Sequence, residues 1–122
     1  MISHTMLGTN NFEKAESFYS SIISAIGGTQ IHKSDTVAFW QFEGSNTKFA
    51  LTVPFNGEAA SSGNGAMVAF TLPNPEKVNE VFALAIRLGA SNEGEPGARN
   101  NGAYYAAYFR DLDGNKIAIF HR

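Results

Sequence analysis

The 122-residue chain carries few side chains that could take part in chemistry, and His4 is the strongest candidate among them. A histidine can act as a general base or donate a hydrogen bond to a ligand near neutral pH. Tyr104 and Tyr105 offer hydroxyls to a ligand, and Trp40 offers an aromatic wall. Each also has a purely structural interpretation: a histidine satisfied by its neighbours, tyrosines packed with their hydroxyls at a rim, and a tryptophan in the core or at a subunit interface.

Composition and missing motifs exclude several classes of protein. The chain has no cysteine, which excludes a disulfide framework, a thiolate zinc site and a cysteine nucleophile. It also lacks a phosphate-binding loop, a dinucleotide-binding glycine fingerprint and an H-E-x-x-H zinc motif. The net charge is −2 and the basic residues are scattered, so we expect no nucleic-acid partner.

Hydropathy argues against a membrane partner. No apolar run approaches the roughly 20 residues that a membrane span needs, and the segment Met1–His4 lacks the basic and apolar regions of a signal peptide. We therefore expect a cytoplasmic protein.

The elements that must position these residues are repeated once along the chain. Residues 3–14 align without a gap with residues 66–77, and each segment runs from a short strand into Asn-x-Glu-Lys. Asn11 and Asn74 are placed to cap a helix by accepting from its first free N–H groups. Apolar residues at three- and four-residue steps predict amphipathic helices after both caps, ending at Gly27-Gly28 and at Gly89.

A run of strands follows each helix, so each half reads as βαβββ. Expected strands are about 29–33, 36–43 and 47–53 in the first half, and about 103–110 and 116–121 in the second, with one irregular strand in the loose stretch 91–102. The small, polar segment 54–65 reads as a linker between a first module (about 1–53) and a second (about 66–122). Because a half of about 55 residues is near the lower limit for independent stability, we expect one domain spanning 1–122.

Strand alternation predicts which residues face away from the helices. Phe49 and Leu51, and likewise Ile117 and Ile119, form aliphatic faces that suit packing under a helix. The other faces are mixed and small, which suits an open surface; they carry His4, Met6, Ala50, Met67, Ala69 and Ala118. Tyr104 and Tyr108 share one face of their strand with Ala106, and Tyr105 lies on the other.

The paired modules, the opening segment 3–10 and the closing segment 105–117 together resemble the vicinal oxygen chelate superfamily. This group contains glyoxalase I, the bleomycin and fosfomycin resistance proteins and ring-cleaving dioxygenases. Its most specific feature here is the turn Asp111-Leu112-Asp113-Gly114-Asn115 before an isoleucine-containing strand. The resemblance spans essentially the whole chain, is nearest to small bacterial glyoxalase-like proteins, and implies an α+β fold of two tandem βαβββ modules forming a curved mixed sheet with an open cup.

The resemblance also implies a divalent metal in the cup, held by the first and last strands of each module. Those positions here are His4, Ala50, Met67 and Ala118. Only the histidine suits such an ion, because methionine sulfur prefers soft ions and alanine has no ligating side chain. Catalytic sites commonly use three protein ligands. We therefore expect no cofactor and disfavour a bound metal, with His4 the only retained candidate, and interpret the four positions as ligand-binding.

Two classes of function stay open. One is a glyoxalase-like protein with a degraded metal site that binds a small molecule in its cup. The other is a metal-dependent lyase or isomerase of the lactoylglutathione lyase type, acting on a small oxygenated or thiol-conjugated substrate with His4 as its candidate catalytic residue.

Two further expectations concern Arg99 and the assembly state. The resemblance places the loop around Arg99 near the mouth of the cup, where an arginine could hold a carboxylate or phosphate, or else be solvated. The family often pairs its chains, so we expect a homodimer.

Overall fold

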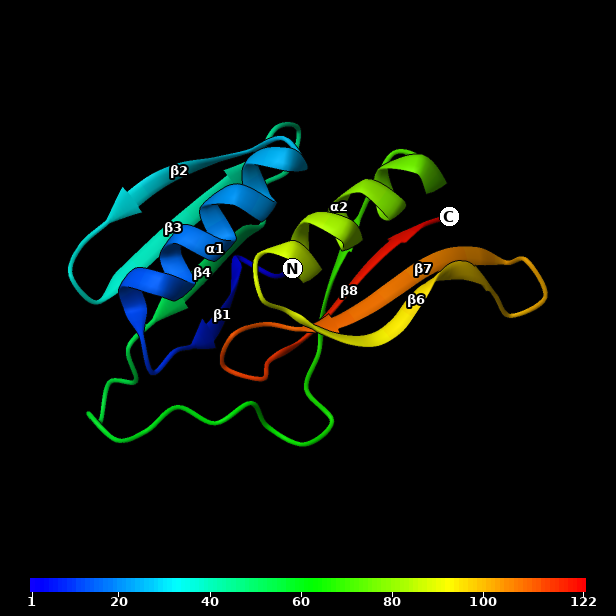
Figure 1. Cartoon of the computed structure of the whole chain (residues 1–122). Coiled ribbons are helices and arrows are strands. Elements are labelled where there is room, and N and C mark those ends of the chain that lie inside the picture. Colours follow the sequence, from blue (N-terminus) through cyan, green and yellow to red (C-terminus); the bar gives the residue numbers. More distant parts are fainter. The chain divides into compact units, whose positions relative to one another are not determined.

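The computed structural model describes all 122 residues and divides into two compact units, Met1–Ser62 and Gly63–Arg122. Each unit contains one helix and four strands in the order βαβββ (Figure 1). The first unit has β1 (His4–Gly8), α1 (Phe12–Ala25), β2 (Gly28–Lys33), β3 (Val37–Phe42) and β4 (Lys48–Thr52). The second has β5 (Val68–Thr71), α2 (Pro75–Arg87), β6 (Ser91–Arg99), β7 (Tyr104–Arg110) and β8 (Lys116–His121). The predicted α+β fold of two tandem modules is confirmed.

Each unit builds its own four-stranded mixed sheet, ordered β1-β4-β3-β2 in the first and β5-β8-β7-β6 in the second. In both, the first strand pairs in parallel with the last, and the remaining pairs are antiparallel. This arrangement brings the start of each module beside its end. Residues far apart in sequence, such as Ala69 and Ala118, therefore become direct neighbours across a strand pair.

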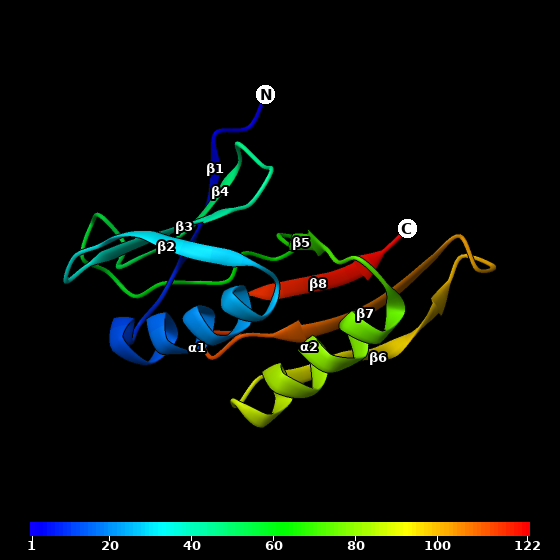
Figure 2. The ribbon, with the colours of Figure 1, turned by 90° about the horizontal axis from the view of Figure 1, so that it is seen from above.

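Each helix covers one face of the sheet in its own unit (Figures 1 and 2). Asn11 and Asn74 cap the helices as predicted, because their side-chain oxygens accept from the backbone N–H groups of Lys14 and Lys77. The buried helical side chains recur at three- and four-residue steps and pack on the sheets; they are Ala15, Phe18, Tyr19, Ile22 and Ile23 in α1 and Val78, Val81, Phe82 and Ala85 in α2. Neither helix is long and apolar enough to cross a membrane.

The stretch expected to be loose is more regular than its sequence indicates. Residues Ser91–Arg99 form β6, a nine-residue edge strand paired with β7. The pairing register shifts twice, between Asn92 and Gly94 and between Gly94 and Gly97. These shifts explain why glycine and proline are tolerated, since bulged edge strands absorb residues that interrupt a regular ladder.

The turn between β7 and β8 is held by one buried carboxylate. Asp111 is 5% exposed, and its Oδ1 accepts from the backbone N–H groups of Asp113 and Asn115 at 2.9 Å. Its Oδ2 accepts from the Asn115 side-chain amide at 2.9 Å. Asp111 therefore organises the turn.

Candidate functional site

The open face of the second sheet carries a hollow. Register places Ala69, Ala118 and Tyr108 side by side across three strands. Tyr104 and Phe120 continue the same face, with their ring centroids 6.4 Å apart and edge to face. The opposite face, with Phe109, Ile117 and Ile119, packs as core beneath α2.

This hollow has a volume of about 180 Å³ and is lined by Met67, Ala69, Tyr104, Tyr108, Ala118, Phe120 and Arg122. Its floor is made of small side chains, with Ala118 only 3% exposed, while Met67 is 49% exposed beside it. The hollow exists because alanine occupies positions where a larger side chain would fill the space between Phe120 and the two tyrosines. Three residues predicted from the sequence, Met67, Tyr104 and Ala118, meet here.

Three cationic side chains surround the tyrosines. The Arg99 guanidinium carbon and the Lys116 Nζ each lie 5.7 Å from the centre of the Tyr108 ring. The Arg122 guanidinium lies 5.7 Å from the centre of the Tyr104 ring. Contacts of this length are favourable, because the face of an aromatic ring attracts a cation.

Arg99 is positioned by the irregular backbone of β6. Its Nη2 donates to the Glu95 carbonyl oxygen at 2.6 Å, and its Nη1 donates to the Ala98 carbonyl oxygen at 3.4 Å. These bonds hold the guanidinium over Tyr108 instead of leaving it free in a loop. The sequence identifies Arg99 as a candidate, and the structure shows what orients it.

The pKa of the Tyr108 hydroxyl depends on its neighbours. The Tyr104 side chain hydrogen-bonds with Tyr108 and raises the pKa of the Tyr108 hydroxyl above its usual value, and partial burial raises this pKa further. The nearby Arg99 charge acts in the opposite direction and lowers the pKa of Tyr108, but by less. Tyr108 is therefore a neutral hydroxyl at physiological pH, able to donate to a ligand or accept from one.

Two residues predicted as ligand-binding lie away from the open faces. Trp40 is 1% exposed and packs against Phe49 on the helix side of the first sheet, with ring centroids 5.9 Å apart. The structure corrects this prediction, because a side chain enclosed in the core has no surface to offer a ligand. Tyr105 lies on the α2 side of β7, where its hydroxyl donates to Asn79 Oδ1 at 2.7 Å. It anchors the helix and does not line the hollow.

The open face of the first sheet presents a different surface. His4 and His32 both contact the Phe39 ring edge-on, with centroid separations of 5.3 Å and 6.4 Å. His4 Nδ1 lies 3.2 Å from Ser3 Oγ. Ala50, fully buried, lies in register with Met6 on one side and Phe39 on the other. His4 is thus exposed next to an aromatic ring, and its neighbours on this face are not acidic.

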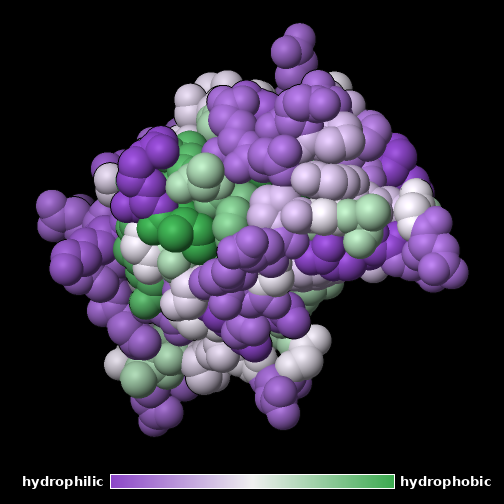
Figure 3. Space-filling model, turned by 45° about the vertical axis from the view of Figure 1, so that its right-hand side comes forward, coloured by the Kyte–Doolittle hydropathy of each residue, from purple (hydrophilic) through white to green (hydrophobic).

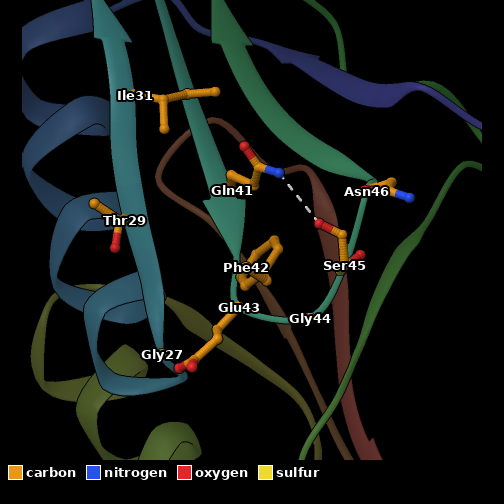
Figure 4. Close-up of a pocket in the computed structure, with 9 residues that line it drawn as sticks. All are labelled: Gly27, Thr29, Ile31, Gln41, Phe42, Glu43, Gly44, Ser45 and Asn46. Carbon is orange, nitrogen blue, oxygen red and sulfur yellow. Dashed lines mark hydrogen bonds between the residues drawn. The ribbon is translucent and has the colours of Figure 1, made fainter.

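A second, larger and more open depression of about 660 Å³ lies at one end of this sheet (Figure 4). It is bounded by β2, the end of β3 and the 43–46 turn, where Gln41 Nε2 donates to the Ser45 carbonyl oxygen at 3.3 Å. Thr29, Ile31 and Phe42 add to its walls. None of the residues predicted from the sequence lines it. Its polar turn and open shape are typical of a solvated surface.

The residues at the family's metal positions do not fit a catalytic divalent ion. Within the first unit, the pair of positions is His4 and Ala50; within the second, it is Met67 and Ala118. A thioether and two methyl groups supply no hard donor. No cluster of three histidine, aspartate, glutamate or cysteine side chains occurs elsewhere. Donor chemistry alone therefore argues against a resident metal of the usual kind at these positions.

The face shown in Figure 3 is largely hydrophilic, with apolar side chains gathered in one area of it. The large apolar side chains that remain exposed on the open faces include Met6 and Ile31 in the first unit and Met67 in the second.

This architecture defines an α+β protein of tandem βαβββ modules, each with a helix on one sheet face. The chain belongs to the Glyoxalase/Bleomycin resistance protein/Dioxygenase superfamily, whose model matches residues 1–119. It is similar to a glyoxalase/bleomycin resistance protein from Albidiferax ferrireducens T118, at 34% identity and a TM-score of 0.91, with 100% of this chain and 98% of the other covered.

More distant structures share the fold. A glyoxalase-related enzyme from Fulvimarina pelagi is 17% identical, with a TM-score of 0.82 over 100% of this chain and 88% of its own. A lactoylglutathione lyase from Agrobacterium tumefaciens is 18% identical, with a TM-score of 0.73 over 99% of this chain and 92% of its own. None of the curated proteins compared matches the sequence.

The sequence-based candidates omit four residues that line the hollow, Ala69, Tyr108, Phe120 and Arg122, and also Lys116 beside Tyr108. A signal for them exists, because alternation along two strands puts Tyr108 with Tyr104, and Lys116 with Ala118. The alternation pattern does not reveal that β7 pairs with β8, and this pairing places Tyr108 directly opposite Ala118.

Proposed function

We propose that this chain is a metal-independent member of the superfamily that binds a small molecule, and that the hollow on the open face of the second sheet is part of its binding site. The observation that carries this proposal is the hollow itself, floored by alanines and walled by aromatic rings and cations. Concave, mostly apolar surfaces with a few polar groups are typical of small-molecule sites.

The metal positions support the same proposal. Ala118 and Met67, which the family resemblance identifies with metal ligands, line the hollow instead. A residue that does not bind a metal can instead shape the hollow, and a small side chain such as that of Ala118 leaves room there for a ligand atom. Chemistry that needs a tightly held ion is disfavoured by this donor set.

Metal analysis of the purified protein and a substitution that fills the hollow together test the proposal. Protein purified without chelators should hold well under one equivalent of any divalent metal per chain, and about one equivalent would contradict the metal-independent function. In a fragment screen by ligand-observed NMR, Ala118→Phe should abolish the hits that the unmodified chain gives, because the ring fills the floor. Met6→Leu, a volume-conserving change on the open face of the other sheet, should preserve them, and hits that survive Ala118→Phe would overturn the site.

A substitution of His4 distinguishes the enzyme alternative from the proposed binding function. If the chain acts on lactoylglutathione, His4→Ala should abolish turnover while the far-ultraviolet circular dichroism spectrum stays unchanged. We expect no such turnover in the unmodified chain, because no acidic side chain accompanies His4 on its sheet face. The similarity to the Agrobacterium lyase supports a common fold and leaves this expectation in place.

We also propose that the chain acts in the cytoplasm as a homodimer, since members of this superfamily often pair. Light scattering should then give twice the chain mass of 13.2 kDa. A mass equal to one chain at micromolar concentration would contradict the dimer.

A further inference from the structure

The hollow on the second sheet is surrounded by positively charged side chains that take part in no salt bridge. Its lining includes the side chain of Arg122 and no acidic side chain. Lys116 and Arg99 both lie against Tyr108 in its wall. None of these three cations forms an ion pair, because the ion pairs of the chain use Lys33, Lys77 and Arg110.

The acidic side chains of the same region are already engaged. Glu93, whose carboxylate also interacts with Lys116 through space, accepts from Arg110 Nε at 2.7 Å. Glu95 accepts from the Asn92 side chain at 3.3 Å. The Arg99 guanidinium donates its hydrogen bonds to the carbonyl oxygens of Glu95 and Ala98. These acceptors carry no net charge, so the positive charge of Arg99 is not compensated by them. Three cations gathered around two tyrosines repel one another, and an anion would relieve that repulsion.

From these charges we infer that the ligand of this hollow is a small organic carboxylate whose apolar part is about the size of one ring. The inference rests on the proposed binding function and adds the chemical class of the ligand. The volume of about 180 Å³ sets the size, since an apolar cavity of about 150 Å³ holds benzene. The alanine floor and the rings of Phe120 and Tyr104 accept the apolar part. Lys116, Arg122 and the tyrosine hydroxyls face its carboxylate, as cations and hydroxyls do in other anion sites.

Benzoate and benzamide test the inference, because they share a ring and differ in charge. Binding is followed by chemical-shift changes of backbone amides of the full chain during titration with each compound. Benzoate should bind about tenfold more tightly than benzamide. Lys116→Gln should weaken benzoate about tenfold and leave benzamide unchanged. Arg87→Gln is the matched control: it removes the same charge from α2, which covers the other face of this sheet, and should change neither affinity.

The outcomes distinguish a failure of the carboxylate inference from a failure of the binding function. If benzamide binds as tightly as benzoate, with shifts at Ala118 and Tyr108, the carboxylate inference is overturned and the binding function stands. If benzoate is preferred but Lys116→Gln has no more effect than Arg87→Gln, the anion lies elsewhere and the inference is again overturned. If neither compound shifts these residues while the spectrum is that of a folded protein, both the inference and this site for the proposed function fall.

Discussion

Tyr108 shows how a single residue gains its character from its neighbours. Its own sequence context, Tyr-Ala-Ala-Tyr-Phe, does not distinguish it from Tyr104. In the structure it is touched by Arg99 and Lys116 and interacts with the Tyr104 hydroxyl. The Tyr104 interaction and partial burial raise its pKa, so the folded protein favours the protonated hydroxyl.

This raised pKa predicts a change in alkaline stability. An unfolded tyrosine titrates near 10, and the pKa of Tyr108 is higher in the folded state. Between these two values the folded state binds more protons than the unfolded state, so its free energy of unfolding falls as pH rises. The contribution is fully present below pH 10 or so and is lost as pH rises through the folded pKa. Tyr108→Phe should therefore reduce the loss of stability above pH 10.

Urea denaturation of both proteins at a series of alkaline pH values measures this difference. Tyr105→Phe serves as a control for losing one tyrosine hydroxyl on the opposite face of the strand. Parallel pH profiles for Tyr108→Phe and the unmodified chain would contradict the prediction.

At the scale of elements, α1 is joined to the edge strand β2 through one carboxylate. Glu16 Oε1 accepts from Ser20 Oγ at 3.0 Å and from Gln30 Nε2 at 2.9 Å, and Glu16 Oε2 lies 3.4 Å from Lys33 Nζ. Burial raises the pKa of Glu16, but the hydrogen bonds from Gln30, Ser20 and Lys33 outweigh it and lower the pKa below the usual value. The charged form of Glu16 therefore stabilises the contact between helix and strand.

Glu16→Ala should lower the free energy of unfolding by about 1–2 kcal/mol at neutral pH, because three polar partners lose their acceptor. The folded pKa is lowered, so the stabilisation is present above the usual carboxyl pKa and is lost as pH falls through the folded value. Thermal unfolding at neutral pH and at acidic pH measures both effects. Glu43→Ala, on an exposed turn, should change stability by no more than about 0.5 kcal/mol. Equal losses for the two variants would contradict the structural role of Glu16.

The whole molecule raises the question of whether its two units unfold together. Each unit has its own sheet and helix, yet each spans only about 60 residues. Domains of this size bury a smaller fraction of their unfolded chain's surface than larger domains do, and are marginal alone. We propose that the chain unfolds as one domain.

Trp40 provides the measurement, because it is the chain's single tryptophan and lies in the core of the first unit. Its fluorescence should report the same urea midpoint as far-ultraviolet circular dichroism, which senses both units. Two separated transitions, with Trp40 following only one, would show that the units unfold independently.

Much of the fold follows from local pattern. Each of these patterns depends only on residues that are close together in sequence: the helix caps at Asn11 and Asn74, the apolar stripes of the helices and the alternation along the strands. They therefore predict the elements and the repeat. The strand β6 is predicted least well, because its bulges are stabilised by pairing with β7 and its own sequence resembles a loop.

The sequence by itself determined the tandem βαβββ plan and the residue types at the four positions that the resemblance identifies with metal ligands, because residue type at a strand position needs no tertiary information. Only the tertiary structure decided which aromatic residues lie on an open sheet face and which lie in the core. Both faces of β3 are aromatic, and pairing of Trp40 with Phe49 put that ring under α1. Likewise, pairing of Tyr108 with Ala118 built the hollow and brought Lys116 to it. Such pairings join residues distant in sequence, and local periodicity does not encode them.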